Sequence, residues 1–300
     1  MAGLASLVLA DARFPGGGHV HSGGLEEAVS RGAVSDVESL GSFLRGRLRT
    51  AGRIAACFAA AAAHRARPAA SHERTPRGEG FDEGSAREVP GEVGRGPAAD
   101  AAAPADAAAP ADAAAPADAA ALSHERPPRG EGFDEGSARD VPGGGWGAMD
   151  AEFDARTPSA AQRAASRAQG RAALRAVRAA WPSPVLDALT SAHRHPHHPL
   201  LAGAVIGHAG EDPAAAARCV GYLAVSGPAS AAVRLLGLDP FAVNAVLVAL
   251  GPDLDELTAE AAALAAGPVA DLPAPGAPVL DLMAESHVRH HRERVRLFAS

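Results

Sequence analysis

Residues 157–181 read TPSAAQRAASRAQGRAALRAVRAAW, without an alternating apolar pattern or a run of β-branched residues. Thr157 is a good N-cap residue, and Pro158 follows at the first helical position, where proline is tolerated. Alanine, the strongest helix former, is the commonest residue in the rest of the stretch. These features predict a helix from about Thr157 to Trp181.

Arginines form a stripe along this helix. They recur every four residues at Arg163, Arg167, Arg171 and Arg175, and Arg178 extends the series. Like charges at this spacing repel by a few tenths of a kcal/mol per pair. The stripe is therefore either a solvated face or the counterpart of an acidic surface, on this chain or on a partner. Gly170 lies in mid-helix and would permit a close approach to another helix.

Similar signals place the other helices. Ser35-Asp36-Val37-Glu38 has the spacing of a capping box, and Ser22 is placed to cap a helix near Gly24. The predicted spans are about 36–66, 213 to a break at Gly227-Pro228, 229–236, 240 to a break at Gly251-Pro252, and 253–266. Residues 267–279 are predicted to be a linker, and 280–300 an amphipathic or partly disordered tail.

Composition supports an all-α fold with an unusual core. Hydrophobic residues make up 47% of the chain but aromatic residues only 4%, so the core must rely on alanine and leucine between closely spaced helices. All 28 basic residues are arginine, which excludes lysine chemistry such as a Schiff base or a P-loop. The net charge of −7 argues against nucleic-acid binding. No secretory signal or membrane-length apolar run is apparent, so no membrane association and a cytoplasmic location are expected.

The middle of the chain is of low complexity. Residues 71–93 and 123–145 are near copies, and between them ADAAAP repeats every six residues. Recurrent proline prevents a continuous helix, and this composition cannot bury enough apolar surface to fold. Residues 68–146 are therefore predicted to be a disordered insertion. The expected domain is a single bundle-like unit of 1–67 and 147–280, followed by a partner-binding C-terminal tail, 281–300.

The N-terminal stretch 7–29, LVLADARFPGGGHVHSGGLEEAV, invites two catalytic interpretations. Its glycines could suggest a phosphate loop, but no lysine-containing loop motif or preceding strand is present. His21 beside Ser22 could suggest a base and nucleophile, but no nucleophile elbow surrounds them. Neither interpretation is favoured, and the chain is not predicted to be an enzyme.

Four motifs in order resemble the UreF family of urease accessory proteins. The first contains its family-motif residues Pro15, Gly17, Gly18, Ser22, Gly24, Leu25 and Glu26. RAASRAQGRAAL at 163–174 contributes Gly170, and SAAVRLLGLDP at 230–240 contributes Arg234. The chain ends in RLFAS, a further match. In the third motif Gly237 replaces the usual proline, and Asp239-Pro240 replaces the usual Gly-Gln.

The resemblance implies a helical homodimer that performs no chemistry itself. Such proteins bind a second accessory protein, UreD or UreH, and the nickel-carrying GTPase UreG, and the assembly docks on apo-urease. Nickel is expected as transient cargo, with no tightly bound cofactor. Arg234 lies where the family carries a basic residue facing the GTPase. The other expected partner-binding residues are Arg163, Arg167, Arg171, Arg296, Leu297 and Phe298.

Histidines suggest an alternative function. His193, His195, His197 and His198 cluster in HRHPHHP, and imidazole is a suitable nickel ligand. The cluster is a candidate metal site of a histidine-rich metallochaperone, or else a set of surface histidines on a loop. A generic helical adaptor with no connection to urease is a further alternative.

Overall fold

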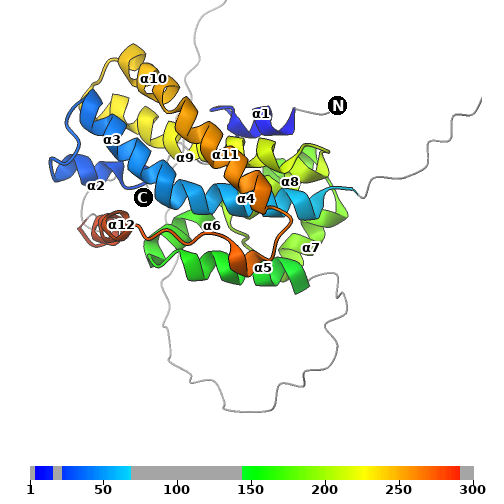
Figure 1. Cartoon of the computed structure of the whole chain (residues 1–300). Coiled ribbons are helices and arrows are strands. Elements are labelled where there is room, and N and C mark those ends of the chain that lie inside the picture. The colour runs from blue at the N-terminus through cyan, green and yellow to red at the C-terminus, as the bar shows by residue number, and fades with distance from the viewer. Residues whose placement is uncertain (1–3, 16–21, 69–143, 291–300) are drawn as a thin grey trace, which may run out of the picture. The chain divides into compact units, whose positions relative to one another are not determined.

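The computed structural model describes residues 4–15, 22–68 and 144–290, and no strand occurs among them, as the all-α prediction requires. The described helices belong to one compact unit (Figure 1). They are α1 (Ala5–Ala10), α2 (Leu25–Ser30), α3 (Val37–Arg47), α4 (Arg53–Ala66), α5 (Gly144–Arg156), α6 (Ala160–Ala180), α7 (Pro184–Ala192), α8 (His198–His208), α9 (Pro213–Leu236), α10 (Pro240–Ala249), α11 (Gly251–Leu264) and α12 (Pro278–His290). A π turn (Leu48–Gly52) joins α3 to α4, and a 3₁₀ turn (Val269–Asp271) precedes α12.

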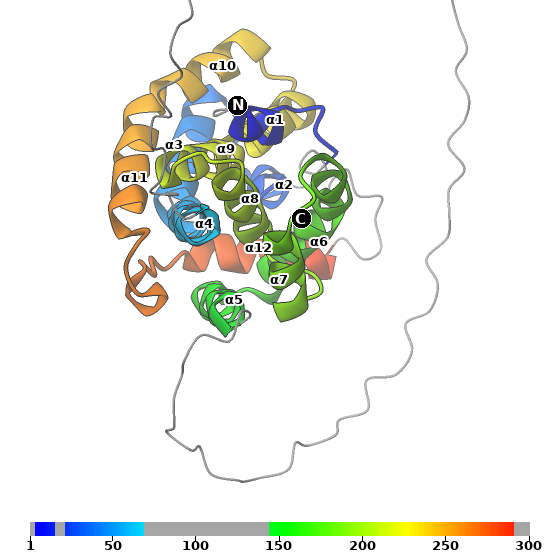
Figure 2. The same cartoon turned by 90° about the vertical axis from the view of Figure 1, so that its right-hand side faces the viewer.

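The core is built where α4 packs against α8 and α9 (Figure 2). Contact between α4 and α8 is so close that a Cβ on Gly203 would lie 2.2 Å from the Ala59 carbonyl oxygen. On Gly207 it would lie 2.1 Å from the carbonyl oxygen of Ala63. Small residues thus allow two backbones to approach, which confirms the predicted alanine-based core. The free thiols of Cys57 and Cys219 are both buried.

Helix α9 is the only described helix long and apolar enough to cross a membrane. It packs against α1, α4, α8 and α11, so its apolar character is that of a core helix. The predicted break at Gly227-Pro228 is wrong, because α9 continues through Pro228 to Leu236. Proline removes one ladder hydrogen bond but does not end a helix whose neighbours hold it in place.

Two N-caps differ from prediction by one or two residues. Asp36, not Ser35, caps α3, and its carboxylate accepts from the Ser39 amide at 2.8 Å. Ser159, not Thr157, caps α6. The predicted helix 36–66 is also interrupted by the π turn, which inserts an extra residue into one turn. Both observed caps are local, because Asp36 forms a capping box with Ser39 and Ser159 accepts from the Gln162 amide.

Two predicted boundaries also move. Helix α5 begins at Gly144, within the last three residues of the predicted insertion, and the stretch 69–143 lies outside the described residues. Helix α12 begins at Pro278 and buries Ala284 and His287 against the unit, so the predicted tail boundary at 281 falls inside a packed helix. Residues 291–300 lie outside the description.

Candidate functional site

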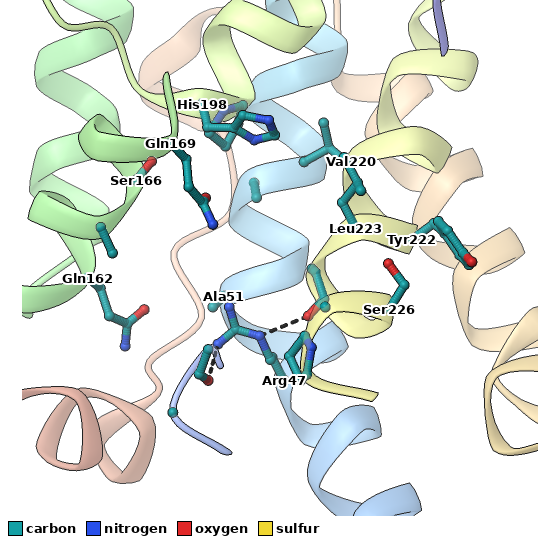
Figure 3. A pocket seen from close by; sticks show the side chains of 18 of the residues that line it. Arg47, Ala51, Gln162, Ser166, Gln169, His198, Val220, Tyr222, Leu223 and Ser226 are labelled. Atoms are coloured by element: carbon teal, nitrogen blue, oxygen red, sulfur yellow. Dashed lines mark hydrogen bonds between the residues drawn. The ribbon is translucent and has the colours of Figure 1, made fainter. Parts of the chain in front are cut away.

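A cavity of about 540 Å³ lies between α6, α9 and the π turn, with the N-terminal stretch and α12 completing its wall. Figure 3 shows its polar residues. Gln162, Ser166 and Gln169 come from α6, and Ser226 and Tyr222 from α9. Ile54, Val220, Leu223 and Leu247 contribute apolar surface. We call this space the Arg47 cavity, after the cation at its wall.

Arg47 is held by two backbone carbonyls. Its Nε–H donates to the Ala224 oxygen at 2.9 Å and an Nη1–H donates to the Gly23 oxygen at 2.7 Å (Figure 3). In a regular helix the Ala224 carbonyl would accept from the amide of residue 228, but Pro228 has no N–H. Arg47 therefore satisfies a carbonyl that the proline leaves open.

Arg47 points to the opposite side of its helix from Arg45 and Arg49, which are four residues apart and share a face. Arg45 and Arg49 both contact Asp253 of α11, at 3.2 and 2.7 Å. Arg47 instead faces the cavity.

Two adjacent glycines of the N-terminal motif, Gly23 and Gly24, lie against the Arg47 guanidinium on the side away from α9. Gly23 and Gly24 have φ values of +62° and +90°, in the left-handed region. A Cβ on Gly23 would lie 2.7 Å from the Arg47 guanidinium carbon. Leu25 and Ser22 next to them are fully buried. The N-cap residue of α2 is Gly24, which has no side chain to accept a hydrogen bond. The prediction that Ser22 caps this helix is therefore wrong.

The remaining family-motif residues are placed differently. Glu26 lies with its Oε2 3.9 Å from Nε2 of the buried His287. Pro15 is exposed, and Gly17 and Gly18 lie outside the described residues. A Cβ on Gly170 would lie 2.0 Å from the Pro196 carbonyl oxygen. The predicted close approach at Gly170 is therefore to the loop before α8.

The arginine stripe meets acidic residues of its own chain, most closely at Arg167. Arg163 also lies 3.8 Å from Asp154, and Arg178 lies 3.8 Å from Asp187. Arg167 donates to Asp150 at 2.9 Å and to Asp154 at 2.6 Å, both on α5. Arg163 donates to the carbonyls of Thr157 and Pro158. Arg171 is exposed, as is Arg234 near the end of α9. Arg296, Leu297 and Phe298 lie outside the described residues.

His197 lies within the same network and is fully buried. Its Nε2 lies 2.9 Å from Asp154 Oδ1, and its Nδ1 lies 3.1 Å from Ser166 Oγ. Burial, and next the charge of Arg167, lower the pKa of His197, against the opposing effect of Asp150 and Asp154. Although burial raises the pKa of Asp154, hydrogen bonds from Arg167 and His197 lower it overall. A neutral imidazole thus bridges a carboxylate and a hydroxyl.

The four loop histidines do not form one ligand set in the described structure. Within the described ranges, only Asp150, Asp154 and His197 bring three possible ligand atoms within 4.8 Å of one another. The Arg167 guanidinium already pairs with both of these carboxylates. His193 Nδ1 accepts from Arg167 at 3.1 Å, and His198 lines the Arg47 cavity. His195 carries a pKa lowered by burial and then by Arg171 and other nearby cations.

Comparison with known proteins agrees with this arrangement of motifs. The UreF family model matches residues 96–251. A urease accessory protein UreF of Mycolicibacterium vanbaalenii is 36% identical over 301 residues, covering 100% of both chains. The UreF proteins of Mycobacterium marinum and Mycobacterium tuberculosis are 36% and 33% identical over 295 residues, each covering 98% of this chain and 97% of the relative.

The chain belongs to the UreF family. It is a urease accessory protein, and this membership implies a role in urease maturation. The family motifs at 15–26 and 163–174 meet near the Arg47 cavity, because Gly23 holds Arg47 and α6 lines the wall. Sequence patterns pointed to both motifs but not to Arg47, whose role depends on a proline 181 positions later in the chain.

Proposed function

We propose that this UreF-family protein is a scaffold that links the nickel-carrying GTPase UreG to apo-urease and regulates GTP-dependent nickel insertion. Membership of the family over nearly the whole chain is the observation that carries this proposal. Burial of the motif residue Ser22 supports a structural rather than a nucleophilic role for the motif. The protein acts without chemistry of its own, in the cytoplasm, with nickel as transient cargo.

Exposed apolar side chains on α1 support self-association. Leu4 and Leu7 are 58% and 67% exposed, and Tyr222 on the adjoining α9 is 39% exposed. Clustered apolar exposure of this kind marks interaction surfaces. We assign this α1 face, defined by Leu4, Leu7 and Tyr222, to the homodimer.

A second exposed apolar surface lies on α10. Phe241 and Val248 are 85% and 71% exposed, and Asn244 and Ala245 lie on the same side of the helix, which carries no charged residue. This α10 face is available to the accessory protein UreD or UreH and to apo-urease. The C-terminal residues Arg296, Leu297 and Phe298 remain proposed contacts of the same accessory protein.

Arg234 provides the direct test of the link to the GTPase. Arginine suits bidentate carboxylate recognition, and one interface arginine can contribute about 2 kcal/mol or more to binding. Arg234→Ala should therefore weaken retention of UreG in a pull-down by about thirtyfold while the dimer persists. Arg49→Ala is the matched control, because Arg49 is an exposed helix arginine that contacts Asp253. Unaltered UreG retention by Arg234→Ala would refute the assignment.

An independent nickel-binding role has less support. Of the four loop histidines, His197 is buried against Asp154 and Ser166, and His193 accepts from Arg167. Nickel would have to displace the Arg167 guanidinium from the two carboxylates before binding the Asp150, Asp154 and His197 set. Calorimetry with nickel on the wild type and on a variant with all four histidines changed to alanine separates the two roles.

A further inference from the structure

The Arg47 cavity contains a cation whose hydrogen-bonding capacity is only partly used. A guanidinium has five N–H donors. The described contacts use one on Nε and one on Nη1, and both acceptors are neutral carbonyls. Three donors, one on Nη1 and two on Nη2, therefore have no protein acceptor among the described residues. They belong to a side chain that lines the Arg47 cavity.

The charge on Arg47 is not offset by a carboxylate. Burial lowers the pKa of its guanidinium to about 10, with no described acidic group opposing the effect. The group still carries its proton at neutral pH. Arg47 is half-buried, and charges withdrawn from bulk water are ordinarily paired or hydrogen-bonded throughout. A charged group left in this state is complementary to an anion that enters from outside.

Other charged residues of the cavity wall are already engaged. Asp11 pairs with Arg13 at 2.6 Å, and Arg156 contacts Glu152 and the carbonyls of Ala270 and Leu272. Asp281 accepts from Gln162 Nε2 at 3.0 Å, and burial, followed by the nearby Glu285, raises the pKa of Asp281. Among the described residues of this wall, Arg47 is thus the cation with open donors.

The other residues of the cavity wall indicate the chemical character of the rest of the ligand. Ile54, Leu223 and Leu247 line the same space and offer no hydrogen bonds, whereas Gln169 and Ser226 add two neutral polar groups. A volume of about 540 Å³ falls within the usual range for small-molecule sites. A small inorganic anion would leave most of this apolar surface without a contact.

We propose that the Arg47 cavity binds a small carboxylate with an apolar body, with the carboxylate on Arg47 and the body against Ile54, Leu223 and Leu247. Arginine and carboxylate form the strong, charge-assisted type of hydrogen bond. A bare divalent cation would be repelled by Arg47, so the site is distinct in chemistry from a nickel site. The proposal does not depend on the role in urease maturation.

The test is calorimetric titration of the full chain with hexanoate, hexanamide and inorganic phosphate. Hexanoate should bind, whereas hexanamide, which lacks the charge, and phosphate, which lacks the apolar body, should bind at least about tenfold more weakly. Arg47→Gln should lose hexanoate affinity by about tenfold or more. Arg49→Gln should bind as the wild type does, because Arg49 contacts Asp253 on the outside of the helix.

Several outcomes would overturn the proposal. They are no hexanoate binding to the wild type at millimolar concentration, equal binding of hexanamide, and equal binding of hexanoate to Arg47→Gln. Phosphate binding as tight as hexanoate binding would contradict the proposal that the ligand has an apolar body. Circular dichroism will show whether Arg47→Gln is folded. If it is not, the ligand series on the wild type and on a Leu223→Asn variant still tests the proposal. Leu223→Asn must then weaken hexanoate binding more than phosphate binding.

Discussion

His197 has one role suggested by the sequence and a different role in the structure. In sequence it belongs to a metal-like cluster, but in the structure it is a buried link between α5, α6 and the loop before α8. Its ring lies 4.4 Å from the Phe153 ring, centroid to centroid, in addition to its bonds with Asp154 and Ser166. A ring enclosed in this way stabilises the fold in its neutral form, because the charged form would lose solvation.

This environment predicts a pH dependence of stability. The pKa of His197 is lowered in the folded chain, while an unfolded histidine titrates at about 6.5. Acidification therefore protonates the unfolded state first, and the His197 contribution, full above about pH 6.5, is lost as the pH falls toward the folded pKa. The free energy of unfolding from urea titrations should fall less steeply between pH 7 and pH 5 in His197→Gln than in the wild type. Equal slopes would show that His197 does not titrate differently on folding.

Arg47 marks the limit of prediction at the residue scale. The glycines at 23 and 24 were recognisable as a motif, and their left-handed conformations explain why glycine is needed there. That Arg47 donates to Gly23 and to the carbonyl that Pro228 leaves open follows from how α3, α9 and the N-terminal stretch pack together. Both are tertiary features, and local propensity does not encode them.

At the scale of elements, the contact between α4 and α8 depends on the absence of side chains. Gly207→Ala would place a Cβ 2.1 Å from the Ala63 carbonyl oxygen, which is rigid backbone. Overpacking of this kind typically costs about 1–3 kcal/mol. Urea unfolding should show a loss of that size.

Gly46→Ala is the matched control for this prediction. It lies in α3, is exposed, and a Cβ there meets nothing within 4 Å. Replacing an exposed helical glycine with alanine should stabilise the chain by up to about 1 kcal/mol. If both variants shift stability in the same direction, the close packing of α4 on α8 does not limit residue size at position 207.

Helix starts were predictable to the extent that their signals are local. Asp212 and Asp239 cap α9 and α10 next to a first-turn proline, as expected. Helices α5, α7 and α8 had no such prediction. Helix α7 nevertheless has the same local signal, a Ser183 cap followed by Pro184. The stop predicted at Pro228 is wrong because tertiary support for a helix is not visible in its own sequence.

At the scale of the molecule, self-association through the α1 face is the expected basis of assembly. Leu7→Asp would place a charge in an apolar contact, which is costly without a partner. Light scattering should show a dimer for the wild type and a monomer for this variant. Val279→Asp changes an apolar residue of similar exposure on α12 and should remain a dimer. A dimeric Leu7→Asp would place the interface elsewhere.

We propose above that this chain is needed to load urease with nickel. The most direct measurement expresses the urease subunits with UreD or UreH and UreG in a host without urease genes, with and without this chain. Urease activity and nickel per active site in the purified enzyme are then compared. Both should fall sharply without the chain and return when it is supplied. Full activity and full nickel content in its absence would contradict the proposal.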